Sequence, residues 1–144
     1  MTVRKVLFIC FGNLCRSPMA AGFFNEAAPG RSFKAESAGV RAVDGANPSL
    51  LAVLEMKRRG VDITAHRARN VSSVDPDAFD TVIALDREVG ALFSSAHPRH
   101  KDLRIWNVPD PYGSSAGRYQ QAADLLQTNI EDLLREFRSS APKR

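Results

Sequence analysis

Residues 3–18 read VRKVLFICFGNLCRSP, and this stretch decides the fold. Its first seven residues are apolar apart from Arg4 and Lys5, which is typical of a strand buried in a parallel sheet. Ser17 and Pro18 are residue types that begin a helix, with serine as the N-cap and proline in the first turn. The stretch therefore predicts a strand, a tight loop and a helix in immediate succession.

The rest of the 144-residue chain continues this alternation of strand and helix. Short apolar runs predict further strands at 32–37, 80–85 and 103–108. Helical periodicity with start and stop residues predicts helices at 17–27, 49–60, 87–93 and 115–137, with Ser49 as the N-cap of the second. The apolar face expected for the last helix consists of Ala122, Leu125, Leu126, Ile130, Leu133, Leu134 and Phe137.

Strands separated by helices imply right-handed crossovers and a parallel sheet covered on both faces. We therefore expect an α/β fold of three layers, α-β-α, with four parallel strands in the flavodoxin-like or Rossmann-like order 2-1-3-4. The length suits one domain, expected at 1–138, with a frayed tail at 139–144. Ligands of such sheets bind beyond the carboxyl ends of the strands, which places Cys10 and Cys15 at the expected site.

Composition narrows the classes of function. Hydrophobic residues make up 44% and charged residues 25%, so a core can form and a wholly disordered chain is excluded. No apolar run approaches the roughly 20 residues that cross a bilayer. The N-terminal segment lacks a secretory cleavage site, so we expect a cytoplasmic protein. The net charge of +4 is dispersed, which indicates a solvated surface rather than a nucleic-acid or membrane partner.

The loop between the first strand and the first helix has the features of an anion cradle. Cys10 and Arg16 enclose five residues, and a loop of this length can curl so that its N–H groups point inward. Gly12 and Asn13 are residue types that tolerate a left-handed backbone. The following helix adds unpaired N–H groups and the positive end of its dipole. Arg16 can grip two oxygens of a tetrahedral oxyanion.

Cys10 would face an anion bound in this cradle. A helix N-terminus and a neighbouring cation favour the thiolate form of a cysteine, and Ser17 could add a hydrogen bond to the sulfur. A thiolate under a bound phosphate is a nucleophile, and catalysis through a phosphocysteine follows. A single cysteine is more commonly a small buried apolar residue, but the Cys-x5-Arg-Ser spacing at a strand-to-helix junction favours chemistry.

Other site types do not fit the sequence. A nucleotide-binding P-loop needs Gly-x4-Gly-Lys-Ser/Thr, which the sequence lacks, and a dinucleotide fingerprint needs glycine partners that Gly12 does not have. Two cysteines are too few for a disulfide scaffold, and zinc would need further ligands nearby. The two cysteines are therefore buried packing, a redox pair or groups that take part in chemistry.

A leaving group needs a proton, and Asp110 is the candidate donor. It lies between Pro109 and Pro111 on a rigid turn after the fourth predicted strand. Alone it would be an ordinary turn aspartate, but near the cysteine loop it becomes a general acid and then a base for water. Tyr112 could form one wall of a substrate slot.

Three motifs make the sequence similar to the low-molecular-weight protein tyrosine phosphatase family. They are VLFICFGNLCRSPMA at 6–20, Ser37-Ala38-Gly39 followed by GVDITAHRAR at 60–69, and Asp110-Pro111-Tyr112. Their order and spacing cover nearly the whole chain. The resemblance implies hydrolysis of phosphotyrosine and small aryl phosphates through a phosphocysteine intermediate, with inorganic phosphate as product and no metal.

The resemblance also implies a role for each matching residue. Cys10 is implied as nucleophile, Arg16 as phosphate clamp and Asp110 as general acid. The implied phosphate-binding loop consists of Phe11, Gly12, Asn13, Leu14, Cys15, Arg16 and Ser17. The implied supporting network consists of Asn13, Ser17, Ser37 and His66, and the implied substrate slot of Phe11 and Tyr112. Cys15 matches a loop cysteine often taken as a reversible disulfide partner, with simple packing as the alternative.

Two departures from the family pattern concern the slot. No aromatic residue lies between Gly39 and Pro48, and Gly113 follows Tyr112 where relatives often have a second aromatic. The sequence therefore predicts a slot with a thin wall. The position of Cys10 at the base of a cradle still favours a long aryl phosphate over a short phosphoserine.

Three alternative functions share parts of this pattern. An arsenate reductase of the same fold relays a disulfide through late cysteines, and this chain has none after Cys15. Similar protein arginine phosphatases carry threonine at the position of Leu14, and leucine favours an aryl substrate. A non-catalytic phosphate-binding module would not need Cys10, Arg16 and Asp110 together. We expect a phosphotyrosine-containing protein as partner, and a monomer or weak dimer as the assembly.

Overall fold

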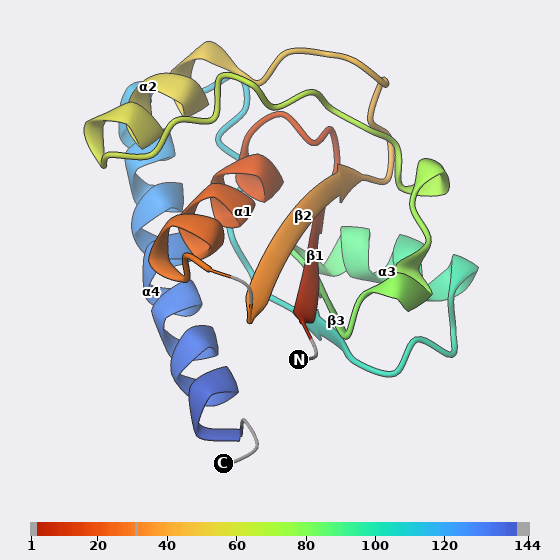
Figure 1. The fold of residues 1–144 in the computed structure, drawn as a ribbon. Helices are drawn as coiled ribbons and strands as arrows, with labels where there is room; N and C mark the ends of the chain where they lie inside the picture. The colour runs from red at the N-terminus through yellow and green to blue at the C-terminus, as the bar shows by residue number, and fades with distance from the viewer. Residues whose placement is uncertain (1–2, 31, 141–144) are drawn as a thin grey trace.

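The computed structural model describes residues 3–30 and 32–140. In this part of the chain, four parallel strands form one sheet in the order β2-β1-β3-β4 (Figure 1). The strands are β1 (Arg4–Cys10), β2 (Phe33–Gly39), β3 (Thr81–Ala84) and β4 (Leu103–Ile105). The predicted α/β class and strand order are therefore confirmed.

Helices cover both faces of this sheet. Within the described residues the α-helices are α1 (Arg16–Ala27), α2 (Leu50–Arg58), α3 (Arg87–Ala96) and α4 (Ala116–Ser140). Two short 3-10 helices, η1 (Val71–Ser73) and η2 (Pro76–Ala78), precede β3. Helix α1 packs on β1, β2 and α4, and α2 packs on α4, whereas α3 covers β3 and β4 on the other face (Figure 1). The result is the expected three-layer arrangement.

The alternation of side chains along β1 divides the core into two parts. Val6, Phe8 and Cys10 belong to the cluster formed with α1, α2 and α4, whereas Leu7 and Ile9 belong to the cluster formed with α3. All five side chains are buried. Cys10 therefore ends the central strand with its side chain on the α1 side of the sheet.

Several predicted boundaries need correction. Strand β2 ends at Gly39 rather than at 37, and helix α3 ends at Ala96 rather than at 93. Strand β4 ends at Ile105 rather than at 108; the Val108 N–H still donates to the Leu85 carbonyl at 3.0 Å, but the Val108 carbonyl accepts from Arg16 Nη1 at 2.9 Å. Helix α4 includes Ser139 and Ser140, where a frayed tail was expected. The rest of that predicted tail, 141–144, lies outside the described residues.

Of the two predicted serine caps, Ser17 is wrong, whereas Ser49 holds the predicted N-cap position without a side-chain cap bond. Helix α1 begins at Arg16 with Cys15 in the N-cap position, so Ser17 lies inside the first turn and its hydroxyl contacts the sulfur of Cys10. Ser49 occupies the N-cap position of α2 but makes no side-chain cap bond. Its hydroxyl lies 2.7 Å from the Tyr119 hydroxyl instead. Both hydroxyls contact side chains outside their own helix instead of the N–H groups at the helix end.

The predicted apolar face of α4 is correct except at one position. Its buried members are Ala122, Leu126, Ile130, Leu133, Leu134 and Phe137, joined by Tyr119 and Ala123, which the prediction missed. Leu125 is 43% exposed, because it lies beside the buried stripe rather than within it.

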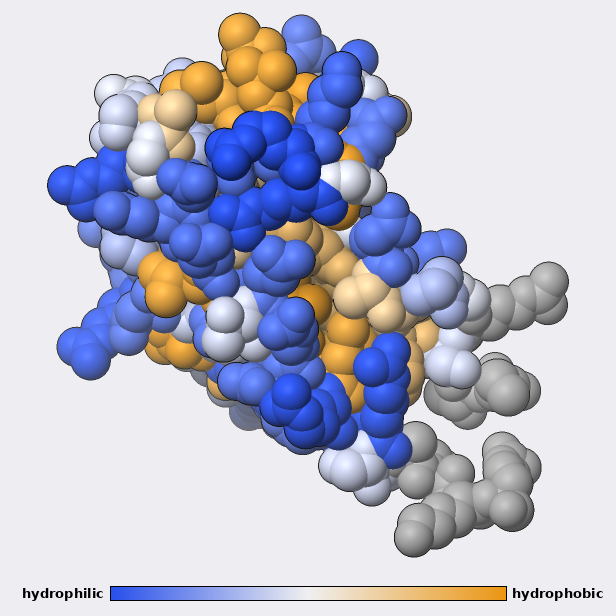
Figure 2. Space-filling model, turned by 90° about the vertical axis from the view of Figure 1, so that its left-hand side faces the viewer, coloured by the Kyte–Doolittle hydropathy of each residue, from blue (hydrophilic) through white to orange (hydrophobic). Residues whose placement is uncertain are grey.

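Polar residues dominate the opposite side of these helices. In Figure 2, hydrophilic residues cover most of the face viewed, and hydrophobic residues gather at its upper end. Exposed apolar side chains on α2 include Leu50 and Leu54. Among the described residues, no helix combines the length and the hydropathy that a membrane crossing requires.

The neighbouring leucines of α4 provide a matched test of this packing. We expect Leu126→Ala to lower the free energy of unfolding by about 2–5 kcal/mol, because the side chain is fully buried and leaves a cavity. We expect Leu125→Ala to change it by less than about 0.5 kcal/mol, as at ordinary surface sites. Urea unfolding of both variants measures the difference, and equal losses would contradict the assigned face.

Candidate active site

The loop between β1 and α1 curls back towards the end of β1. Asn13 has a left-handed backbone, with φ +58°, and its N–H lies 3.3 Å from the sulfur of Cys10. Gly12, the other residue expected to be left-handed, is not. The glycine that the loop requires is Gly39 at the end of β2, where a Cβ would lie 2.7 Å from the carbonyl oxygen of Phe11. The loop therefore packs backbone to backbone against β2.

Cys10 lies at the base of this loop and is 3% exposed. Ser17 Oγ lies 2.9 Å from its sulfur, and the Asn13 side-chain amide donates to the same Ser17 oxygen at 2.7 Å. The Ser17 oxygen also lies 3.4 Å from the carbonyl of Ala38, to which its hydroxyl can donate. The sulfur therefore accepts the backbone N–H of Asn13, and in the contact with Ser17 either the thiol or the hydroxyl can be the donor.

The fully buried side chain of Asn13 joins the loop to its surroundings. Its amide nitrogen donates to Ser37 Oγ at 3.0 Å as well as to Ser17. Its amide oxygen accepts the backbone N–H of Arg69 at 3.0 Å. Sequence analysis grouped Asn13, Ser17, Ser37 and His66, and the structure brings all four together.

His66 contacts the backbone of Asn13. Its Nε2 lies 2.8 Å from the carbonyl oxygen of Asn13, and a carbonyl only accepts, so Nε2 carries a proton. Burial and the guanidinium groups of Arg67 and Arg69 hold the pKa of His66 below its ordinary value, although the bond to the Asn13 carbonyl favours the charged form. The neutral ring with its proton on Nε2 is sufficient for this contact.

Arg16 is almost fully buried beside the loop, at 2% exposure. Its Nη1 donates to Asp86 Oδ2 at 2.8 Å and to the Val108 carbonyl at 2.9 Å. Its Nη2 lies 3.7 Å from Asp110 Oδ2. These acceptors come from the ends of β3 and β4, so the sheet itself fixes the guanidinium at the site.

Asp86 is a site residue that the sequence analysis missed. It caps α3 by accepting the N–H of Val89 at 2.8 Å while it pairs with Arg16. Burial disfavours its charge, but the N–H of Val89 and the guanidinium of Arg16 outweigh burial and lower its pKa. Its position directly after β3, at the carboxyl edge of the sheet, was the available signal.

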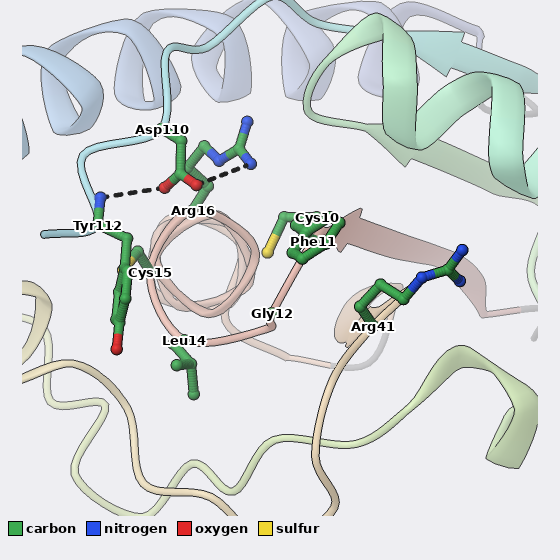
Figure 3. Close-up of a pocket in the computed structure, with 9 residues that line it drawn as sticks. All are labelled: Cys10, Phe11, Gly12, Leu14, Cys15, Arg16, Arg41, Asp110 and Tyr112. Atoms are coloured by element: carbon green, nitrogen blue, oxygen red, sulfur yellow. Dashed lines mark hydrogen bonds and ion pairs between the residues drawn. The ribbon is translucent and has the colours of Figure 1, made fainter.

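Asp110, Phe11 and Tyr112 lie at the mouth of the site. A cavity of about 270 Å³ is lined by Cys10, Phe11, Gly12, Leu14, Cys15, Arg16, Arg41, Asp110 and Tyr112 (Figure 3). Asp110 Oδ1 accepts the N–H of Tyr112 at 3.1 Å, which leaves the carboxyl beside Arg16. Phe11 is 44% and Tyr112 62% exposed, so both present ring surface to solvent. The sequence-predicted nucleophile, clamp, acid and slot residues therefore share one cavity.

Cys15 lines the same cavity but has a different environment. Its sulfur lies 3.3 Å from the Tyr119 hydroxyl, which in turn contacts Ser49. Burial raises the pKa of Cys15 to about 11, although both hydroxyls oppose the shift. Both cysteines are free thiols in this structure, so a disulfide between Cys10 and Cys15 stays a prediction. Tyr119 was missed because nothing local connects it to residue 15.

Arg69 and Glu36 were missed as well. Arg69 Nη2 pairs with Glu36 Oε1 at 2.6 Å, and its Nε donates to the Ser37 carbonyl at 3.0 Å. These bonds hold the Arg69 backbone where it meets the Asn13 side chain. Among the described residues, no three His, Cys, Asp or Glu side chains lie together as a metal site would require.

Comparison with known proteins agrees with this geometry. Residues 5–143 match the family described as low molecular weight phosphotyrosine protein phosphatase. The chain belongs to this family. As a low molecular weight phosphatase it is a hydrolase with a cysteine nucleophile.

Individual relatives cover almost the full length. The low molecular weight protein-tyrosine-phosphatase YfkJ of Bacillus subtilis is 36% identical, covering 90% of this chain and 93% of its own. The protein-arginine-phosphatase of Geobacillus stearothermophilus is 31% identical, with coverage of 94% and 97%. The crystal structure of the low molecular weight protein tyrosine phosphatase from T. tengcongensis superposes with a TM-score of 0.86 at 34% identity, covering 92% and 99%.

The lowered pKa of His66 predicts a pH dependence of stability. The folded state binds its proton less readily than the unfolded state, so stability is lost as the pH falls below the unfolded value of about 6.5 and continues to fall until the folded pKa is passed. We expect His66→Gln to remove this component. Urea midpoints at pH 8 and pH 5 test it, and a wild-type difference no larger than that of the variant would contradict the assignment.

Proposed function

We propose that this phosphatase hydrolyses phosphotyrosine in proteins through a phosphocysteine formed on Cys10. The observation that carries the proposal is the sulfur of Cys10 at the base of a cavity, where it accepts the N–H of Asn13 and lies 2.9 Å from the hydroxyl of Ser17. Arg16 and Asp110 line the same cavity. Nucleophile, anion clamp and proton donor are thus within reach of one phosphoryl group.

In the first step the thiolate of Cys10 attacks phosphorus. The phosphoryl oxygens are held by backbone N–H groups of the loop and by the guanidinium of Arg16. The phosphorus–oxygen bond to the substrate breaks, and Asp110 donates its proton to the leaving phenolic oxygen. Arg16 stays fixed because Asp86 and the Val108 carbonyl hold its Nη1, which avoids reorganisation as charge develops.

In the second step water replaces the cysteine. Asp110, now a carboxylate, accepts a proton from the attacking water, and the sulfur–phosphorus bond breaks. The thiolate of Cys10 leaves with the hydrogen bond from Ser17 already in place. Inorganic phosphate is the product, and Asp110 is protonated again for the next turnover.

The walls of the cavity favour an aryl substrate. Phe11, Leu14 and Tyr112 present apolar and aromatic surface above the loop, and an aromatic ring prefers such surroundings. Leu14 offers no polar partner for a guanidinium, which argues against phosphoarginine. The thin wall predicted from Gly113 and from the absence of an aromatic between Gly39 and Pro48 fits a half-open slot.

The remaining alternatives lack support in the chain itself. A disulfide relay of the arsenate reductase type needs further cysteines, and none follows Cys15. A silent phosphate-binding module would not require Asp110 beside the leaving-group side of the cavity. We place the enzyme in the cytoplasm as one domain acting as a monomer or weak dimer, with no nucleic acid, membrane or cofactor partner.

Removal of the nucleophile tests the central step. We expect Cys10→Ser to reduce hydrolysis of p-nitrophenyl phosphate and of phosphotyrosine peptides to background, because a serine hydroxyl is a much weaker nucleophile than a thiolate and a much poorer leaving group in the second step. Phosphate binding, followed by protection against thermal unfolding, should persist and show that the loop is intact. Turnover that survives in Cys10→Ser would overturn the mechanism. If the wild type hydrolysed a phosphoarginine peptide faster than a phosphotyrosine peptide, the proposed substrate class would be overturned.

Removal of the proton donor tests Asp110 separately. We expect Asp110→Asn to slow hydrolysis of phenyl phosphate by about 10²–10⁴-fold, because phenolate is a poor leaving group without protonation. The loss should be clearly smaller for p-nitrophenyl phosphate, whose leaving group needs less help. Equal losses of kcat/KM for the two esters, measured at the pH optimum of the wild type, would assign Asp110 a structural role, because kcat/KM reports the first step, in which the leaving groups differ.

A further inference from the structure

One cation at the cavity has no part in the proposed chemistry. Arg41 lines the cavity from the segment that follows β2, and its side chain is exposed. Figure 3 shows it on the opposite side of the loop from Asp110 and Tyr112. Its guanidinium points away from Cys10 towards the outer edge of the site.

The backbone of Arg41 is fixed to the catalytic loop. Its N–H donates to the carbonyl of Phe11 at 2.9 Å, and the N–H of Val40 donates to the carbonyl of Cys10 at 3.0 Å. Gly39 approaches the same loop so closely that a Cβ there would meet the Phe11 oxygen at 2.7 Å. The position of residue 41 relative to the nucleophile is therefore set by the loop itself.

The charge of Arg41 is not neutralised within the described part of the chain. Arg16 pairs with Asp86 and Arg69 pairs with Glu36, but no described carboxylate lies within 4.0 Å of the Arg41 guanidinium. The hydrogen bond recorded for it goes to the carbonyl of Val40 at 3.2 Å. Most of its N–H donors are available to a group outside the protein.

We propose that Arg41 is a specificity-determining residue that selects phosphotyrosines flanked by an anionic side chain. The proposal rests on the proposed phosphotyrosine hydrolysis. With the phosphoryl group on the loop, the neighbouring residues of the substrate pass over the rim of the cavity. An anion on the Arg41 side meets a guanidinium without a carboxylate partner among the described residues, whereas the opposite side presents Asp110, which carries its proton when it acts as the acid, and the ring of Tyr112. The anionic group is a carboxylate or a second phosphate, both of which match the guanidinium fork.

The size of the effect follows from the exposure of Arg41. Solvent-exposed ion pairs contribute modestly, so we expect an acidic neighbour to raise kcat/KM about two- to fivefold over its neutral isostere at low salt. The gain should shrink as the ionic strength rises, because mobile ions screen exposed charges. A dianionic neighbouring phosphate should gain more than a carboxylate.

The test compares matched phosphotyrosine peptides. Aspartate, asparagine or a second phosphotyrosine is placed directly before or directly after the reacting residue, and kcat/KM is measured for each. For wild type we expect a preference for aspartate over asparagine on at least one side. Arg41→Gln should abolish the preference for aspartate, and Arg41→Glu should reverse it. Arg99→Gln is the control, because it removes the same charge from an exposed residue outside the cavity, and it should keep the wild-type preference.

Each outcome of this test supports or overturns the proposal. Any effect of Arg41 on phosphate binding in general is the same for both peptides, so it cancels in the ratio of their kcat/KM values. Equal rates on the aspartate and asparagine peptides in wild type, or a preference that persists in Arg41→Gln, would overturn the role of Arg41. Failure of phosphotyrosine hydrolysis itself would show as lost turnover of every peptide by wild type, which separates it from failure of this inference.

Discussion

The side-chain amide of Asn13 is the contact on which the rest of the site depends. It receives the backbone N–H of Arg69 and donates to the hydroxyls of Ser17 and Ser37, so three separate segments meet on one buried group. A buried amide without its partners would cost free energy, which fixes the conformation of all three segments together. The left-handed backbone of the same residue turns its N–H towards the sulfur of Cys10.

Much of this arrangement could be predicted from the sequence, because it follows from local patterns. Apolar runs and helical periodicity located every strand and α-helix, and the alternation of the two fixed the parallel sheet. Cys10, Arg16 and the loop between them were found because their chemistry depends on spacing within a few residues. Asp110 was singled out by its place between two prolines after the last predicted strand, whereas His66 was found only through the resemblance to a family.

The residues that were missed hold the site from a distance. Asp86 and Tyr119 each contact a loop residue that is far away in the sequence. The place of Asp86 after the third predicted strand was a signal, whereas nothing in the sequence points to the contact between Tyr119 and Cys15. The partners of the two serine hydroxyls could not be predicted for the same reason. A serine before a helix suits a cap locally, but the Ser17 hydroxyl contacts the sulfur of Cys10 and the Ser49 hydroxyl contacts Tyr119. The same hydroxyl can bond either to an N–H group at the helix end or to a side chain elsewhere in the fold, and the sequence does not show which.

The packing of α4 on α1 has a consequence for the order of events during synthesis. Phe24 of α1 meets Phe137 of α4 edge to face, with ring centroids 6.4 Å apart, and the two helices share one core cluster. The nucleophile and its loop leave the ribosome first, whereas the proton donor and the helix that closes the core emerge much later. A nascent chain therefore carries Cys10 before it carries Asp110 or the helix that completes the core around α1.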